Sequence, residues 1–247
     1  MKNLIQSAFN KLGYRLTKID SFWKPEFGID AFFPLLKSLG FAPRRIIDVG
    51  ANHGHWTRTA LRYFPDAHYT LVEPQDHLKS HIEDLLAAGR NITWINAGAG
   101  DTNGLFPFTI SHRDDSSTFV LDADQARLAG LHQVMVPIRT LNDIVASQAA
   151  APPEMVKIDA EGLDLQVLAG ASNLLGVTDV FLVEACICSN GGPNSAAAVL
   201  DFMSRAGYRL MDITDLNRSP AHKVLWLSEF AFLRDASPLL SRVTSYE

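Results

Sequence analysis

The chain has 247 residues, of which 47% are hydrophobic and 20% are charged, and its formal net charge is -5. This length fits one α/β domain with small additions, and a chain of this size can bury a large core without disulfides or metals. The acidic balance argues against a general nucleic-acid-binding surface, and the lack of any run of 18 apolar residues predicts no membrane span.

The N-terminal segment predicts a helix, since apolar residues recur at helical spacing before Gly13. These residues are Leu4, Ile5, Ala8, Phe9 and Leu12. Packing against the domain is the simpler role, and binding to a partner or a membrane surface is the alternative. Together with a short helix at 29–39, it predicts a helical extension or cover over residues 1–43, ahead of a main domain at 44–247.

The segment lacks the apolar core of a secretory signal. Cys186 and Cys188 lie too close in sequence for an unstrained disulfide. We therefore expect buried, reduced thiols in a cytoplasmic protein.

The stretch around which the chain is organised is 45–55, RIIDVGANHGH. An apolar run at 46–49 ends at Gly50 and Gly54, a pattern typical of a buried parallel strand that turns into a helix. Asp48 lies inside this run, where a carboxylate needs a partner. It either binds a nearby backbone N–H or faces a ligand at the carboxyl end of the strand.

The glycine spacing limits the class of ligand that this loop can bind. A dinucleotide loop has a third glycine between the outer two, but here Ala51, Asn52 and His53 separate Gly50 from Gly54. The next predicted strand, 68–73, ends in Glu73 and Pro74, about 25 residues after Asp48, where an acid can bind a ribose diol. A solvated strand-end charge is the alternative. A nucleoside without a pyrophosphate suggests S-adenosylmethionine as the ligand.

The rest of the chain alternates between strands and helices. Further strands are expected at 91–97, 105–110, 134–139, 155–158, 180–185, 208–213 and 224–233, and further helices at 56–63, 76–88, 163–170 and 194–206. The strands at 105–110 and 134–139 should pair beside the third strand. The polar loop between them offers substrate contacts from His112, Arg113, Ser116 and Ser117, or it is simply solvated.

Two carboxylates follow the strand at 155–158, namely Asp159 and Glu161. The carboxyl end of this strand should lie beside the first glycine loop, so both acids are expected at the ligand crevice. Lys157 shares a strand face with Asp159 and could pair with it.

Three segments, DVGANHG, VEP and KIDAEGLDLQVLAGA, together resemble the FkbM-type family of S-adenosylmethionine-dependent methyltransferases, over about residues 44–184. The resemblance implies a Rossmann-like class I methyltransferase fold, that is, a mostly parallel, doubly wound sheet with an antiparallel closing strand and an added hairpin. It also implies that the turn 97–101, including Gly98 and Asp101, meets the adenine. Asp101 could equally be a turn residue that binds its own backbone.

The same resemblance implies O-methylation of a hydroxyl on a sugar, a glycan or a polyketide-like metabolite. For the general base, the order of preference is Asp159, then His112, then Glu161. Mg²⁺ held by Asp159 and Glu184 is possible but not favoured, because Ala185 and Cys186 stand where a second acidic ligand would be expected.

Two other functions remain open at this point. One is an oxidoreductase or epimerase that uses NAD(P), although Tyr63, Tyr69 and Tyr208 have no lysine four residues later. The other is a non-catalytic protein that keeps the nucleoside site.

Overall fold

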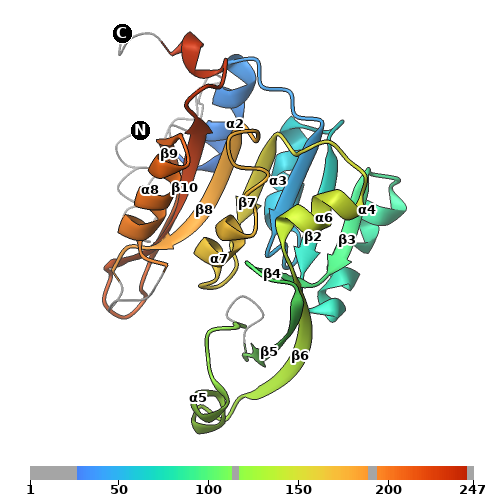
Figure 1. The fold of residues 1–247 in the computed structure, drawn as a ribbon, viewed down its shortest axis with the longest axis vertical. Helices are drawn as coiled ribbons and strands as arrows, with labels where there is room; N and C mark the ends of the chain where they lie inside the picture. The colour runs from blue at the N-terminus through green and yellow to red at the C-terminus, as the bar shows by residue number, and fades with distance from the viewer. Residues whose placement is uncertain (1–26, 113–116, 189–193, 244–247) are drawn as a thin grey trace, which may run out of the picture.

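The computed structural model describes residues 27–112, 117–188 and 194–243. The helix predicted near the N-terminus, as well as Arg113 and Ser116, lies outside these ranges. The main body is a seven-stranded sheet with the order β3-β2-β1-β7-β8-β10-β9, covered by helices (Figure 1). Its strands are β1 (Arg45–Val49), β2 (His68–Glu73), β3 (Ile92–Asn96), β7 (Met155–Ile158), β8 (Val180–Cys186), β9 (Tyr208–Arg218) and β10 (Leu225–Arg234).

The first five strands of this sheet run parallel, whereas β10 is antiparallel to both of its neighbours. The fold is therefore the predicted Rossmann-like arrangement with an antiparallel closing strand. The strand order reverses between β1 and β7, so the chain itself creates a crevice at their carboxyl ends.

Residues of alternating orientation along the strands build two separate hydrophobic cores, one on each side of the sheet. Ile47, Val156 and Phe181 belong to one core, and Ile46, Met155 and Leu182 belong to the other. The helices that supply the rest of these cores are α2 (Ile29–Ser38), α3 (His55–Tyr63), α6 (Leu141–Ser147), α7 (Asp164–Ala169) and α8 (Ala196–Arg205). Burial on both faces explains why the central strands are almost continuous apolar runs.

The structure corrects the prediction of one continuous α-helix at 76–88. The segment forms a 3₁₀ helix, Asp76–Ile82, followed by a short α4 (Glu83–Ala87). The Ser80 hydroxyl donates to the carbonyl of His77 at 2.8 Å. Such local side-chain bonds compete with the regular helix ladder.

A second, three-stranded sheet has the order β4-β6-β5 and carries α5 (Ala123–Leu128) at its far end (Figure 1). Strands β5 (Gly104–Ile110) and β6 (His132–Arg139) pair antiparallel, as the sequence predicts. They do not continue the main sheet beside the third strand, which corrects the expected placement. The chain leaves the main sheet after β3, and the short β4 (Gly98–Ala99) pairs with β6 instead.

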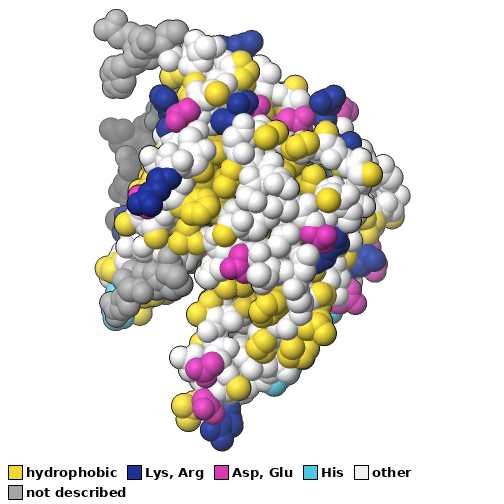
Figure 2. Space-filling model, in the orientation of Figure 1, with side chains coloured by type: hydrophobic (Ala, Val, Ile, Leu, Met, Phe, Trp, Pro, Cys, Tyr) yellow, Lys and Arg dark blue, Asp and Glu magenta, His cyan; other side chains and the backbone are white. Residues whose placement is uncertain are grey.

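In the space-filling view the smaller sheet forms a separate lobe, with hydrophobic side chains on its outer side (Figure 2). Leu105 and Met135 are the most exposed hydrophobic residues of its strands. Within the described residues, no helix combines the length and the apolar character that crossing a membrane requires.

Candidate functional site

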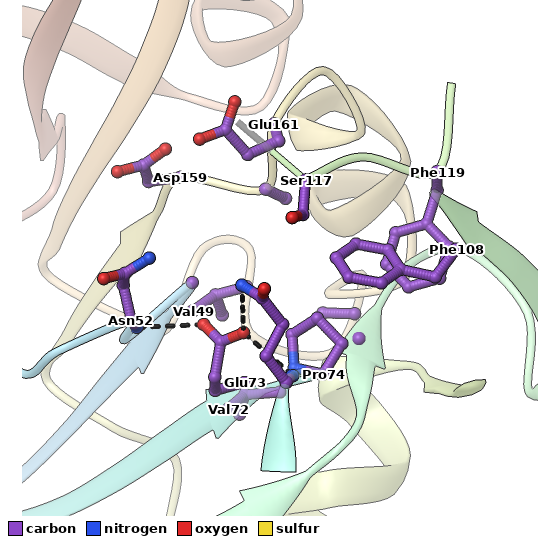
Figure 3. Close-up of a pocket in the computed structure, with 15 residues that line it drawn as sticks. Val49, Asn52, Val72, Glu73, Pro74, Phe108, Ser117, Phe119, Asp159 and Glu161 are labelled. Atoms are coloured by element: carbon purple, nitrogen blue, oxygen red, sulfur yellow. Dashed lines mark hydrogen bonds between the residues drawn. The ribbon is translucent and has the colours of Figure 1, made fainter. Parts of the chain in front are cut away.

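A cleft opens at the carboxyl ends of β1, β2 and β7, on the side that faces the smaller sheet (Figure 3). Its empty volume, including space open to solvent, is about 600 Å³. The lining residues come from strands of both sheets and from the loops after β1, β2, β5 and β7: Val49, Gly50, Asn52, Val72, Glu73, Pro74, Gln75, Gly98, Ala99, Phe108, Ser117, Phe119, Asp159, Ala160 and Glu161.

The floor of the cleft is the glycine loop that follows β1. Gly50 has a φ of 69°, and a Cβ atom placed there would lie 1.8 Å from the carbonyl oxygen of Asp159. Only glycine allows the loops after β1 and β7 to touch in this way. The backbone N–H of Gly50 donates to Val72 at 2.9 Å, which fixes the loop against β2.

Glu73, at the end of β2, is buried and points into the cleft beside this loop (Figure 3). Its Oε2 accepts from the backbone N–H of Asn52 at 2.9 Å, and its Oε1 accepts from the backbone N–H of Gln75 at 3.0 Å and from Nε2 of Gln75 at 3.3 Å. Burial raises the pKa of Glu73, and these hydrogen bonds oppose the rise. Since a carboxylate offers about four lone-pair positions, Oε2 retains one for a ligand.

Lys157 is buried behind the cleft and binds oxygen atoms of both loops. Its Nζ lies 3.0 Å from Oδ2 of Asp159, 3.3 Å from the carbonyl oxygen of Gly50 and 3.6 Å from Oδ1 of Asp48. Burial alone would lower the pKa of Lys157, but Asp159, Asp48 and Glu229 outweigh it and raise that pKa. The predicted pairing of Lys157 with Asp159 is present.

Asp48 lies under the glycine loop and does not line the cleft. It is completely buried, accepts from the hydroxyl of Thr57 at 2.5 Å and faces Lys157. Burial raises the pKa of Asp48, and Lys157 opposes the rise. This arrangement differs from both alternatives expected for Asp48, because its partners are the side chains of Thr57 and Lys157 and it does not line the cleft.

The loop after β7 is held by another buried carboxyl group, that of Asp164. The backbone N–H of Ala160 donates to Oδ1 at 3.0 Å, and Nδ2 of Asn194 donates to Oδ2 at 2.6 Å. Burial raises the pKa of Asp164 to about 7. These hydrogen bonds hold the loop in place, and its residues Asp159 and Glu161 both line the cleft (Figure 3).

The structure brings together most of the predicted site residues but not all of them. Gly50, Asn52, Glu73, Pro74, Gly98, Ser117, Asp159 and Glu161 line the cleft. Asp101 and His112 are exposed and lie outside its lining, and Gly54 packs against Ile82.

Gln75, Phe108 and Phe119 line the cleft without having been predicted to do so. Phe108 and Phe119 form a hydrophobic wall opposite Asp159, with ring centroids 4.5 Å apart (Figure 3). The alternating pattern of the strand at 105–110 marks Phe108 as inward-facing, whereas no local signal marks Phe119.

A second cavity lies on the other side of Asp159 and has an empty volume of about 940 Å³, again including space open to solvent. It shares Gly50, Asn52 and Asp159 with the first cleft. Its remaining lining residues are Ile29, Ala51, His53, His55, Trp56, Lys157, Glu184, Thr214, Asp215 and Glu229.

Sequence comparison assigns the family. The pattern of the methyltransferase FkbM domain matches residues 48–210, about two thirds of the chain. The chain belongs to the FkbM methyltransferase family. This assignment favours the methyltransferase over the nicotinamide-dependent enzyme that the sequence left open. A comparison with curated proteins gives no match.

Two solved structures resemble this chain at low identity. A putative rRNA methylase from Clostridium thermocellum is 10% identical, with a TM-score of 0.51, over 87% of this chain and 99% of that one. The methyltransferase FkbM from Methylobacillus flagellatus is 17% identical, with a TM-score of 0.48, over 76% of this chain. The match spans only 43% of that longer chain.

Two further features of the structure bear on the expectations from the sequence. Within the described ranges, no three His, Cys, Asp or Glu side chains are grouped so that they could hold a metal ion. Cys186 and Cys188 form no disulfide, but Cys186 is only half-buried and Cys188 is exposed, which corrects the expectation of buried thiols. The two thiols are accessible because Cys186 is the last residue of β8 and Cys188 follows it, where the chain leaves the core.

Proposed function

We propose that this FkbM methyltransferase binds S-adenosylmethionine in the first cleft and methylates a hydroxyl group of a sugar, a glycan or a small metabolite. The observation that carries the proposal is the position of Asp159, which lies between two cavities and lines both. One cavity has the features of a nucleoside site. The other is open for an acceptor.

The residues of the first cleft fit the cofactor. Gly50 allows the backbone to approach a ligand closely, and the remaining lone pair of Glu73 Oε2 can accept from one ribose hydroxyl. The second ribose hydroxyl would replace the longest existing bond, that from Nε2 of Gln75. Phe108 and Phe119, together with Gly98, offer an apolar slot for the adenine ring.

When bound, S-adenosylmethionine supplies a methyl group on a positively charged sulfur, which keeps the bonding electrons as the methyl passes to the acceptor oxygen. Asp159 would accept the hydroxyl proton, since it is the carboxylate that lines both cavities. Lys157 holds that carboxylate at 3.0 Å. A positioned base contributes roughly 10²–10⁴-fold to such a step.

Asp159 is preferred to the other two predicted bases on position. Glu161 lines the first cleft but not the second cavity, and His112 lines neither. Lys157 already supplies a positive charge to Asp159 and Asp48, so the proposal includes no Mg²⁺. Activity that is unchanged by a chelator would agree with this choice, and activity restored by added Mg²⁺ would contradict it.

The proposal also includes a cytoplasmic location.

The first experiment is calorimetric titration with S-adenosylhomocysteine, with NAD⁺ as the control ligand. The variant Glu73→Gln should bind about tenfold more weakly, because a neutral amide is a poorer acceptor than a carboxylate. Asp66→Asn, which removes an exposed carboxylate elsewhere, should bind like the wild type. Unchanged affinity in Glu73→Gln would contradict the proposed nucleoside site.

The second experiment measures transfer of a labelled methyl group to hydroxyl compounds. We expect Asp159→Asn to lose turnover while it retains S-adenosylhomocysteine, and His112→Ala to keep both. If Asp159→Asn turns over at the wild-type rate, Asp159 is not the base.

A further inference from the structure

A single hydroxyl group lies in the apolar end of the first cleft. The lining residues at this end belong to the smaller sheet or to the segment that follows β5, and they are Gly98, Ala99, Phe108, Ser117 and Phe119. Among these described residues, Ser117 alone has a polar side chain. It is only 2% exposed, and its side chain points into the cleft (Figure 3).

The backbone around Ser117 is held from two sides. The N–H of Thr109 on β5 donates to the carbonyl oxygen of Thr118 at 2.8 Å, and the N–H of Thr118 donates back to Thr109 at 3.0 Å. The Thr118 hydroxyl donates to the carbonyl oxygen of Glu161 at 2.9 Å, which ties the segment to the loop after β7. Since side chains alternate along an extended segment, Ser117 and Phe119 share the face that lines the cleft.

The hydroxyl of Ser117 has a fixed oxygen and a hydrogen without an acceptor. Its Oγ accepts from the backbone N–H of Ser111 at 3.1 Å. A serine hydroxyl can also donate one hydrogen bond, and in the part of the chain that the structure describes no atom accepts it. Burying a hydroxyl without such a partner is unfavourable. A ligand in the cleft can supply the acceptor.

The proposed position of the nucleoside brings a suitable acceptor to this end of the cleft. With the ribose at Glu73, the base lies against Phe108, Phe119 and Gly98. An apolar wall binds flat rings with little regard to the positions of their nitrogen atoms. Adenine has ring nitrogens that accept hydrogen bonds, so a hydroxyl donor at its edge can distinguish one ring from another.

We propose that Ser117 donates its hydroxyl hydrogen to a ring nitrogen of the adenine and thereby determines which bases the first cleft accepts. The inference rests on the proposed function, since it requires S-adenosylmethionine in this cleft. It assigns Ser117 to the cofactor, whereas the sequence grouped this residue with the contacts to the acceptor.

The test is calorimetric titration of the full-length protein with S-adenosylhomocysteine and with its 1-deaza, 3-deaza and 7-deaza analogues, in each of which a C–H group replaces one ring nitrogen. Ser117→Ala should bind S-adenosylhomocysteine about fivefold more weakly, as expected for the loss of one hydrogen bond. The wild type should bind one of the analogues more weakly by at least the same factor. Ser117→Ala should bind that analogue and S-adenosylhomocysteine equally well, because the contact is already absent. Ser38→Ala, which removes an exposed hydroxyl at the end of α2, is the matched control and should bind all four ligands like the wild type.

A merely structural role for Ser117 predicts a different result. Ser117→Ala would then weaken all four ligands by one common factor, and this outcome would overturn the inference. Equal affinity of the wild type for all four ligands would overturn it as well, and that measurement needs no variant. Urea denaturation shows whether Ser117→Ala retains the fold after the Ser111 N–H loses its acceptor.

The same titrations separate this inference from the proposed function. If the wild type binds S-adenosylhomocysteine but Ser117 shows no coupling to any ring nitrogen, the role of Ser117 is wrong and the cofactor site stands. If the wild type does not bind S-adenosylhomocysteine, the proposed function itself fails.

Discussion

The close approach of Gly50 to the loop after β7 makes Gly50→Ala the most direct test of the site geometry. A Cβ atom at this position would lie 1.8 Å from the carbonyl oxygen of Asp159, whereas real Cβ contacts essentially never fall below 3.0 Å. One of the two loops must therefore move by at least 3.0 − 1.8 = 1.2 Å. Both are held by hydrogen bonds, from Gly50 to Val72 and from Asp159 to Val49.

Two costs add up in this variant. Alanine at a left-handed φ of 69° costs roughly 1–2 kcal/mol relative to glycine. Forcing the loops apart resembles overpacking, which costs typically about 1–3 kcal/mol. We therefore expect Gly50→Ala to lower the free energy of unfolding by roughly 2–5 kcal/mol, which is the sum of the two.

Gly89→Ala is the matched control, because Gly89 has a similar φ of 65° and no atom within 4 Å of the added Cβ. It should show only the backbone cost of roughly 1–2 kcal/mol in urea denaturation. Affinity for S-adenosylhomocysteine should fall about 100-fold in Gly50→Ala, since a displacement near 1 Å has effects of this size. It should be unchanged in Gly89→Ala. Equal stability and equal affinity in the two variants would refute the contact between the loops.

Three further predictions concern buried polar groups. Lys157→Met should destabilise the protein by about 3–5 kcal/mol, because the Asp48 carboxyl loses its buried counter-charge. Asp48→Asn in the same chain should restore part of that stability. Urea denaturation that shows no loss of stability in Lys157→Met would contradict this prediction. Between about pH 5 and pH 9 the folded protein keeps the Glu184 proton that the unfolded chain releases, so the free energy of unfolding should fall as pH rises, by at most about 1.4 kcal/mol per pH unit for this group. Glu184→Gln should flatten that slope, and an identical slope would show that Glu184 titrates normally. Tyr208→Phe should lower the free energy of unfolding by about 1–3 kcal/mol in thermal or urea denaturation. The reason is that the buried hydroxyl of Tyr208 donates to the carbonyl oxygen of Thr178 at 2.7 Å and accepts from the backbone N–H of Gly176. A change near zero would mean that water replaces these two hydrogen bonds.

The sequence predicts the main sheet well because its strands are buried on both faces. The strand Met155–Ile158 is a short apolar run between a proline pair and the acidic loop, and the structure reproduces its predicted bounds. The sequence predicts α7 but neither α5 nor α6, although all three helices have only six or seven residues. The capping residues of α5 and α6, Asp122 and Thr140, were the available signals.

The residues of the candidate site also fall into two groups, those that the sequence predicts and those that it does not. Gly50 and Glu73 were found from local spacing, since a glycine turn and an acid at the next strand end are features of the sequence itself. The aromatic wall and the pairing of Glu184 with Glu229 depend on tertiary placement. Phe119 reaches the cleft only through the smaller sheet, and Glu184 meets Glu229 only through antiparallel register. Neither the docking of a second sheet nor strand register can be read from one segment.

The cleft has walls from two different sheets, with Glu73 on the larger and Phe108 on the smaller. A ligand that touches both walls would bridge the two sheets. By thermodynamic linkage, ligand binding and the docking of the smaller sheet then favour each other by the same coupling free energy. Substitutions on the far side of that sheet, remote from any ligand atom, can therefore tune affinity as effectively as changes inside the cleft.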